Sequence, residues 1–245
     1  MSSSTEGDDT VTHEQAAMRR EWDERAEEDP WHYVLLRDPT DWRGEGERTV
    51  RETLDRFGVR IEAGAAVEIG CGVGRLTWGL RRVTGRVIGI DVSPRMIELA
   101  RANLAGVPGI ELVVGDGASL RPVPDGSASL VFSALTLQHL PDAGLVLGYL
   151  AEAGRVLEPG GRLLVQMNNE SSARFVARRM ANLALRAVRR RSRLEHGRTW
   201  TGTRVSIAEV RRTLDATGIR VDAVAGERSL YCWVVGTRSE VAVGA

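Results

Sequence analysis

Residues 65–77, which read Ala-Ala-Val-Glu-Ile-Gly-Cys-Gly-Val-Gly-Arg-Leu-Thr, decide the fold of this chain. The apolar run from Ala65 to Ile69 predicts a buried strand, and the three glycines that follow at every second position predict a tight turn into a helix beginning near Val73. Glycine is needed where the backbone takes conformations closed to other residues, and where a ligand approaches main-chain N–H groups with no Cβ in the way. On its own, such a turn fits a nucleotide-type ligand or a merely tight bend.

The spacing of the glycines narrows the choice of ligand. A dinucleotide fingerprint, G-x-G-x-x-G, requires glycine where this chain has Arg75. Here Glu68 precedes Gly70, Gly72 and Gly74. This pattern resembles the E/D-x-G-x-G-x-G motif of class I S-adenosylmethionine (SAM) dependent methyltransferases, with every motif position filled. The resemblance implies SAM as the cofactor and a loop, with Cys71 inside it, that lies under the amino-acid end of SAM.

Two further strands are expected to end in carboxylates. The strand from Arg86 to Asp91 ends 21 residues after Gly70, a spacing that suits a strand–helix–strand unit in which Asp91 reaches the ribose hydroxyls. Gly115-Asp116-Gly117 follows a strand expected over Ile110 to Val114. The resemblance implies that the Asp116 carboxylate accepts a hydrogen bond from the adenine amine. The alternative is an aspartate that caps a turn. The remaining expected cofactor contacts are Val92, Met96, Gly117 and Ser133, with core packing as the alternative for Met96.

The resemblance extends continuously from Ala65 to Met167. It includes a strand over Ala128 to Ser133, a helix over Asp142 to Leu157, and the passage Leu-Glu-Pro-Gly-Gly-Arg-Leu that leads into a strand over Arg162 to Met167. It implies an α/β, Rossmann-like fold: a seven-stranded, mostly parallel sheet with an antiparallel last strand, and helices on both faces. The closing hairpin is expected over about Arg220–Ala225 and Leu230–Gly236.

The chain is expected to divide into a disordered arm (1–13), an N-terminal helical lid (14–45) and a SAM-binding methyltransferase domain (46–245) with a helical insertion at about 170–200. In the lid, an amphipathic helix over Glu14–Glu28 precedes Trp31 and Tyr33, which either seal a core edge or line the acceptor pocket. Asn168 and Trp200 are the other acceptor-pocket candidates. The run Arg189 to Arg193 reads as a solvated helix end, with an RNA-facing or acidic-substrate patch as the alternative.

Composition excludes several classes of protein. Acidic and basic residues balance at 33 each, all the bases being arginine, so nucleic acid is an unlikely main partner. No apolar run approaches the roughly 20 residues needed to span a bilayer, and Met1 to Arg20 lacks a signal-peptide core, which favours a soluble cytoplasmic protein. Cys71 and Cys232 are expected to be reduced thiols, and no metal-ligand spacing is present, so no metal is expected.

Methyl transfer is an in-line displacement, so the protein mainly aligns the nucleophile and excludes water. His139 is the candidate base, with a structural or SAM-contacting role as the alternative. Acids on the first helix, followed by aromatics, favour a cationic amine held over a ring face.

The terminal additions resemble bacterial tailoring methyltransferases of secondary metabolism and antibiotic biosynthesis, a group that includes enzymes methylating the N-terminal α-amine of ribosomal peptides. The expected acceptor is thus an amine of a small molecule or peptide, bound by a monomer or homodimer. The alternatives are O-methylation of a hydroxylated small molecule, RNA methylation and a non-catalytic SAM-binding regulator.

Overall fold

The computed structural model describes residues 13–34, 39–61, 64–188 and 202–240. Seven strands form one sheet in the order β3-β2-β1-β4-β5-β7-β6. They are β1 Ala65–Ile69, β2 Arg86–Asp91, β3 Ile110–Val114, β4 Ala128–Ser133, β5 Leu157–Met167, β6 Ile219–Ala225 and β7 Cys232–Arg238. The first five strands pair in parallel with one another, whereas β7 runs antiparallel to both β5 and β6. The expected fold class is confirmed.

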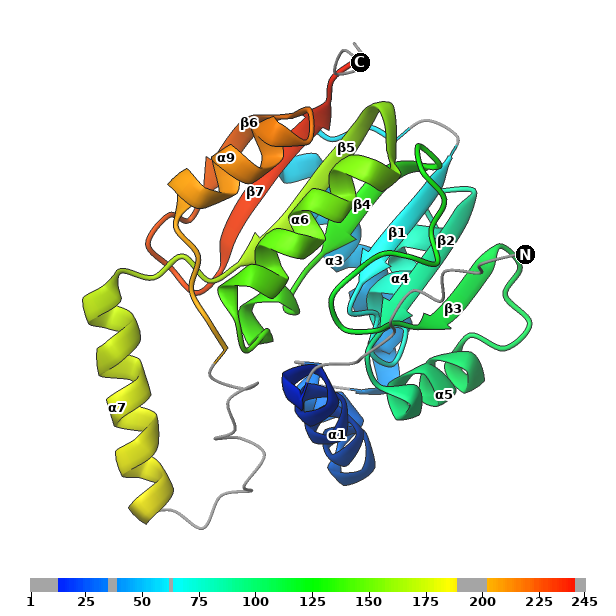
Figure 1. Cartoon of the computed structure of the whole chain (residues 1–245). Helices are drawn as coiled ribbons and strands as arrows, with labels where there is room; N and C mark the ends of the chain where they lie inside the picture. The colour runs from blue at the N-terminus through cyan, green and yellow to red at the C-terminus, as the bar shows by residue number, and fades with distance from the viewer. Residues whose placement is uncertain (1–12, 35–38, 62–63, 189–201, 241–245) are drawn as a thin grey trace, which may run out of the picture.

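Helices cover both faces of the sheet (Figure 1). The helical elements are α1 His13–Glu28, α2 Pro30–Tyr33, η1 Pro39–Asp41, α3 Trp42–Arg56, α4 Arg75–Arg81, α5 Pro94–Asn103, η2 Leu137–His139, α6 Ala143–Val156, α7 Ser172–Val188 and α9 Ile207–Ala216. α6 and α9 lie over one face, α3 and α4 over the other, and α7 projects away from the sheet. None of these helices has the length and apolar character needed to cross a bilayer.

The central strand β1 is buried on both faces of the sheet. Val67 and Ile69 point into the core beneath α6 and α9, and Ala66 points into the core beneath α3 and α4. Strands buried on both faces are the rule in parallel sheets, and each fully buried aliphatic side chain contributes about 2 kcal/mol. This burial fixes the central strands, so the loops that follow β1, β2 and β4 begin from well-defined positions.

Several boundaries differ from those expected. α4 begins at Arg75 instead of Val73, because Gly74 takes a left-handed conformation (φ 88°) that ends the turn before the helix starts. β5 begins at Leu157, since Leu157 already pairs with Ala128 across a register shift. The expected lid boundary at residue 45 falls inside α3. Residues 1–12, the run Arg189 to Arg193 and Trp200 lie outside the described residues.

α1 is anchored over the carboxyl ends of β2 and β3. The Asp23 carboxylate accepts a hydrogen bond from the Ser93 hydroxyl at 2.5 Å, and Ser93 itself caps α5. The Arg19 guanidinium donates to the Gly115 carbonyl at 3.2 Å, and Met18, 2% exposed, joins the main core. The helix α1 is thus part of the packed structure at the sheet edge, and its role as a lid stays a prediction.

Candidate active site

A cavity of about 830 Å³, open solvent at its mouth included, lies at the carboxyl edge of the sheet where α1 and α2 meet the glycine loop. The lining residues come from the N-terminal helices, the β1 and β2 ends, and the loop after β4: Met18, Trp22, Tyr33, Val34, Glu68, Ile69, Gly70, Cys71, Gly72, Arg75, Leu76, Ile90, Asp91, Val92, Met96, Ala134, Leu135, Thr136, His139, Leu140 and Tyr149.

The glycine loop needs its glycines for two separate reasons. Gly70, Gly72 and Gly74 all have positive φ, at 76°, 51° and 88°, where other residues are strained. A Cβ on Gly70 would also lie 2.1 Å from Cγ2 of Thr136. The loop therefore packs directly against the segment after β4 and leaves its backbone exposed to the cavity.

Asp91 lies at the cavity wall with its carboxylate already oriented. One oxygen accepts from the Gly72 amide and the other from the Ser93 amide, both at 2.9 Å. Burial raises the pKa of Asp91 to about 6, against the opposing effect of these backbone hydrogen bonds. Since a carboxylate has about four acceptor sites, each oxygen can accept another hydrogen bond, such as one from a ribose hydroxyl.

Glu68 and Arg75 form the floor of the cavity beside the loop. The Thr77 hydroxyl donates to Glu68 at 2.6 Å, and burial raises the pKa of Glu68 to about 8. The Arg75 guanidinium, 5% exposed, reaches the Val34 carbonyl (3.4 Å) and the Thr49 hydroxyl (3.5 Å), and burial lowers its pKa. From sequence, Arg75 was noted only as the position where the dinucleotide fingerprint has its last glycine. A charged residue directly after Gly74 was nevertheless a usable signal that this side chain belongs to the site.

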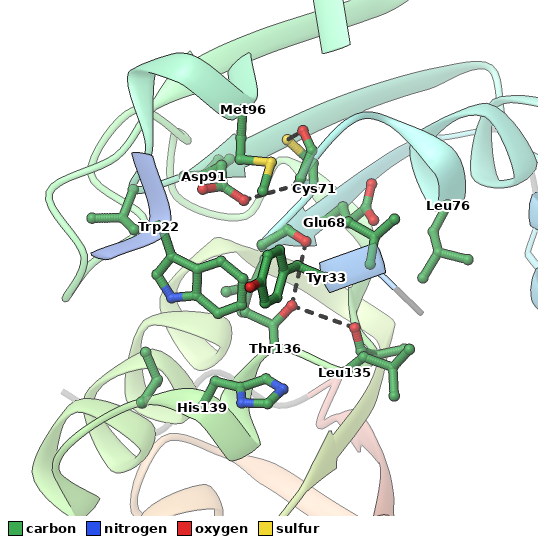
Figure 2. Close-up of a pocket in the computed structure, with 18 of the residues that line it drawn as sticks. Trp22, Tyr33, Glu68, Cys71, Leu76, Asp91, Met96, Leu135, Thr136 and His139 are labelled. Atoms are coloured by element: carbon green, nitrogen blue, oxygen red, sulfur yellow. Dashed lines mark hydrogen bonds between the residues drawn. The ribbon is translucent and has the colours of Figure 1, made fainter. Parts of the chain in front are cut away.

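The opposite side of the cavity is aromatic and carries the candidate base. Figure 2 shows His139 on the opposite side of the cavity from Asp91 and Met96, with Trp22 and Tyr33 between them. The rings of His139 and Trp22 meet edge to face, 5.7 Å apart. Trp22 belongs to the helix expected over Glu14–Glu28 but was not predicted as a site residue, because helical spacing does not show where α1 docks.

Arg25 of the chain itself stacks on this aromatic wall. Its guanidinium carbon lies 4.6 Å from the Trp22 ring centre and 5.8 Å from that of Tyr33, and it pairs with Glu21 at 3.5 Å. The Tyr33 hydroxyl donates to Glu28 at 2.8 Å. The Arg25 guanidinium therefore covers one face of each ring. An acceptor ammonium could not stack on those faces, contrary to the simple expectation from the sequence.

The structure brings together most, but not all, of the residues expected from sequence. Those in the cavity lining are Tyr33, Glu68, Gly70, Cys71, Gly72, Asp91, Val92, Met96 and His139. Those outside the lining are Trp31, Gly74, Asp116, Gly117, Ser133 and Asn168.

Asp116 has hydrogen-bond partners within its own turn. Its carboxylate accepts from the amides of Ala118 and Ser119, both at 2.8 Å, and from the Ser119 hydroxyl at 2.6 Å, which is the turn-capping alternative. Met18 of α1 covers the neighbouring Gly117, where a Cβ would lie 2.7 Å from the Met18 methyl carbon. Asp116 therefore caps a turn and is not among the cavity-lining residues, and its contact with the adenine stays a prediction.

Three other expected contacts are also taken by internal partners. The Ser133 hydroxyl donates to the Ile69 carbonyl at 3.0 Å and so links β4 to β1. Asn168, 1% exposed, accepts from the Glu170 amide at 2.9 Å, and Trp31 packs on Trp42 with ring centres 5.8 Å apart. The Asn168 Nδ2 atom is buried without a hydrogen-bond partner among the described residues. Contacts of these three side chains with cofactor or acceptor stay predictions. No group of three or more His, Cys, Asp or Glu side chains in the described ranges is arranged to hold a metal ion.

Comparison with known proteins agrees with this geometry. Residues 67–165 match the family model described as a methyltransferase domain. The trans-aconitate 2-methyltransferase of Methylobacterium nodulans is 36% identical over 184 residues, which are 70% of this chain and 66% of that protein. The malonyl-[acyl-carrier protein] O-methyltransferase of Hahella chejuensis is 43% identical over 100 residues, 40% of this chain and 34% of that one. The chain thus spans between about a third and two thirds of the length of these relatives.

A solved structure supports the fold over nearly the whole chain. Magnesium protoporphyrin IX methyltransferase from Synechocystis, with bound SAH, aligns with a TM-score of 0.63 at 17% identity, covering 92% of this chain and 100% of that one. Residues 67–165 are a methyltransferase domain, and the chain has the fold of the class I SAM-dependent methyltransferases, whose methyl donor is SAM. The residues present fit this cofactor, because Asp91 lines the cavity with acceptor capacity and the glycine loop lines it beside Asp91.

Proposed function

We propose that this protein transfers the methyl group of SAM to an amine nitrogen of a small molecule or peptide, with the N-terminal α-amine of a ribosomal peptide among the candidates. One observation carries the proposal: His139 shares a single cavity with Asp91 and the glycine loop. A donor held at the loop would then have its acceptor between it and an imidazole. A cytoplasmic location, a monomeric or dimeric state and a role in antibiotic biosynthesis remain predictions.

Each part of the cavity has a role in this proposal. Asp91 would hold the ribose of SAM, and the glycine loop would lie against its amino-acid end. SAM supplies an electrophilic methyl carbon on sulfur. Trp22, Tyr33 and Leu140 enclose the acceptor and exclude water, which favours in-line attack over side reactions. His139 accepts the proton that an amine must lose before, or as, it attacks.

The charge of α1 supports an amine acceptor. The helix carries six acidic side chains against three arginines, so it attracts cations to the mouth of the cavity. Arg25 already stacks on Trp22 and Tyr33. The attraction would therefore come from the acidic helix, while the open ring faces and His139 would contact a neutral amine.

Oxygen is the second candidate for the accepting atom. It is favoured by the relatives, one of which is named as an O-methyltransferase and another as acting on trans-aconitate. A hydroxyl would present its proton to His139 in the same way. The two candidates differ in how the reaction depends on pH, because an amine must first be deprotonated.

The test is turnover of labelled SAM by the full-length protein with pooled bacterial metabolite and peptide extracts, followed by mass and fragmentation of the product. We expect a labelled amine, with a rate that rises with pH across the titration of that amine. A product methylated on oxygen, or a flat pH profile, would overturn amine methylation. Binding of SAM without transfer to any extract would favour the regulator alternative, and transfer to RNA only would favour the RNA alternative.

A further inference from the structure

Leu135, in the loop after β4, has a backbone conformation that is unusual for its residue type. Its φ is 62°, in the left-handed region that side-chain-bearing residues rarely adopt. It lines the cavity two residues after β4 ends and is followed by Thr136 and the short helix η2, which carries His139. Strained backbone of this kind persists only where surrounding contacts hold it.

The contact that holds Leu135 comes from β5. The Leu135 amide donates to the side-chain oxygen Oε1 of Gln166 at 3.1 Å. Gln166 is 6% exposed and interrupts a run of buried apolar residues, between Leu163 and Met167, on a central strand. A buried polar side chain is costly unless it is hydrogen-bonded, so a glutamine here indicates that the bond to Leu135 matters.

The next residue ties the same loop to the donor side of the cavity. The Thr136 hydroxyl lies 3.3 Å from the carbonyl oxygens of both Gly70 and Ala134, as the dashed lines in Figure 2 mark. The Thr136 carbonyl in turn accepts from the His139 amide at 2.8 Å. The segment 134–139 is therefore fixed at one point to β5 and at another to the glycine loop.

We propose that Gln166 is a positioning residue for methyl transfer: by holding the Leu135 amide it keeps the loop in the conformation that sets His139 opposite the glycine loop. Gln166 does not line the cavity and touches neither donor nor acceptor in this proposal. The inference rests on the proposed function for its effect on rate, whereas its effect on the loop can be measured without any acceptor.

The first test compares Gln166→Met with the unaltered full-length protein. Methionine is similar in length but offers no comparable acceptor for the Leu135 amide. We expect amide hydrogen exchange in the segment 134–139 to speed up about tenfold or more, with the segments of β1 and β5 unchanged. We expect methyl transfer to the extracts to fall about tenfold or more, while the affinity for SAH, measured by calorimetry, changes less than about threefold.

Ser129→Ala provides a matched control. The Ser129 hydroxyl donates to the Ala65 carbonyl at 3.2 Å, so this variant also loses a hydrogen bond between buried groups, but at the amino end of β4. We expect it to leave exchange in 134–139 and methyl transfer unchanged. If Ser129→Ala matched Gln166→Met in both measurements, general weakening of the sheet would explain the effect and the proposal would be overturned.

A second variant, at Leu135, tests whether the loop depends on Gln166 because of the positive φ of Leu135. Glycine adopts a φ near 62° freely, so Leu135→Gly removes the need for the restraint. In that background we expect Gln166→Met to change loop exchange by less than about threefold. A full tenfold effect there, or no effect of Gln166→Met in the parent protein, would contradict the proposal. If the parent transfers no methyl group at all, the proposed function fails, and the exchange measurements still decide whether Gln166 holds the loop.

Discussion

The imidazole of His139 meets the indole of Trp22 edge to face, with ring centroids 5.7 Å apart and an interplanar angle of 75°. Trp22 belongs to the N-terminal helix α1, whereas His139 follows β4, so the contact joins segments more than a hundred residues apart. Edge-to-face packing restricts the tilt of the imidazole. The position of the candidate base therefore depends on how α1 is docked.

The first prediction concerns His139→Ala. General base catalysis contributes about 100-fold or more to a rate, so we expect turnover to fall by about that factor while the affinity for SAM stays within about threefold. His32→Ala is the control, because His32 is exposed on α2 and does not line the cavity. Retention of more than about a third of the activity by His139→Ala would exclude a role as base.

The second prediction concerns the pH dependence of SAM binding. Burial raises the pKa of Asp91 to about 6. As the pH falls through this value the carboxylate becomes protonated and a weaker acceptor for ribose hydroxyls. We therefore expect the affinity for SAH to decrease from about pH 7.5 to about pH 5. Asp91→Asn should bind weakly at every pH, with a flatter profile; an equally steep profile in this variant would assign the titration to another group.

The third prediction concerns stability and Glu68. Burial raises the pKa of Glu68 from 4.5 to about 8 in the folded protein, so between these values the folded state binds more protons than the unfolded state. The free energy of unfolding must then fall as pH rises through this window. Above about pH 6.5, where Asp91 is already ionised, we expect the melting temperature of the SAM-free protein to decline towards pH 9, and Glu68→Gln to decline less. Parallel pH curves for the two proteins would contradict this.

The central part of the fold could be predicted because its determinants are local in sequence. The run from Ala65 to Ile69 and the three glycines define a strand and a turn without reference to distant residues. The spacing from Gly70 to Asp91 then fixes a strand–helix–strand unit, because right-handed crossovers leave one arrangement for it. Asp91 and the glycine loop accordingly face the same cavity, as the sequence predicted.

The parts that could not be predicted depend on contacts between distant segments. Asp116 follows a strand end just as Asp91 does, yet its carboxylate accepts from the amides of its own turn, and Met18 of α1 covers the neighbouring Gly117. Helical spacing predicts that α1 has a buried face but not where that face docks. Gln166 did leave a signal, as one polar residue in an apolar strand, but its partner, the Leu135 amide, is visible only in three dimensions.

The last prediction separates the two demands placed on the glycine loop. Gly70 and Gly106 share a φ of 76°, but a Cβ on Gly70 would lie 2.1 Å from Thr136, whereas a Cβ on Gly106 would meet nothing within 4 Å. Gly106→Ala should therefore cost only the backbone strain, about 1 kcal/mol of the free energy of unfolding. Gly70→Ala adds displacement of Thr136 to the same strain, so we expect a larger loss in denaturant unfolding and at least about tenfold weaker binding of SAH. Equal losses of stability and unchanged SAH binding in the two variants would mean that the close approach of Thr136 to the loop does not shape the donor site.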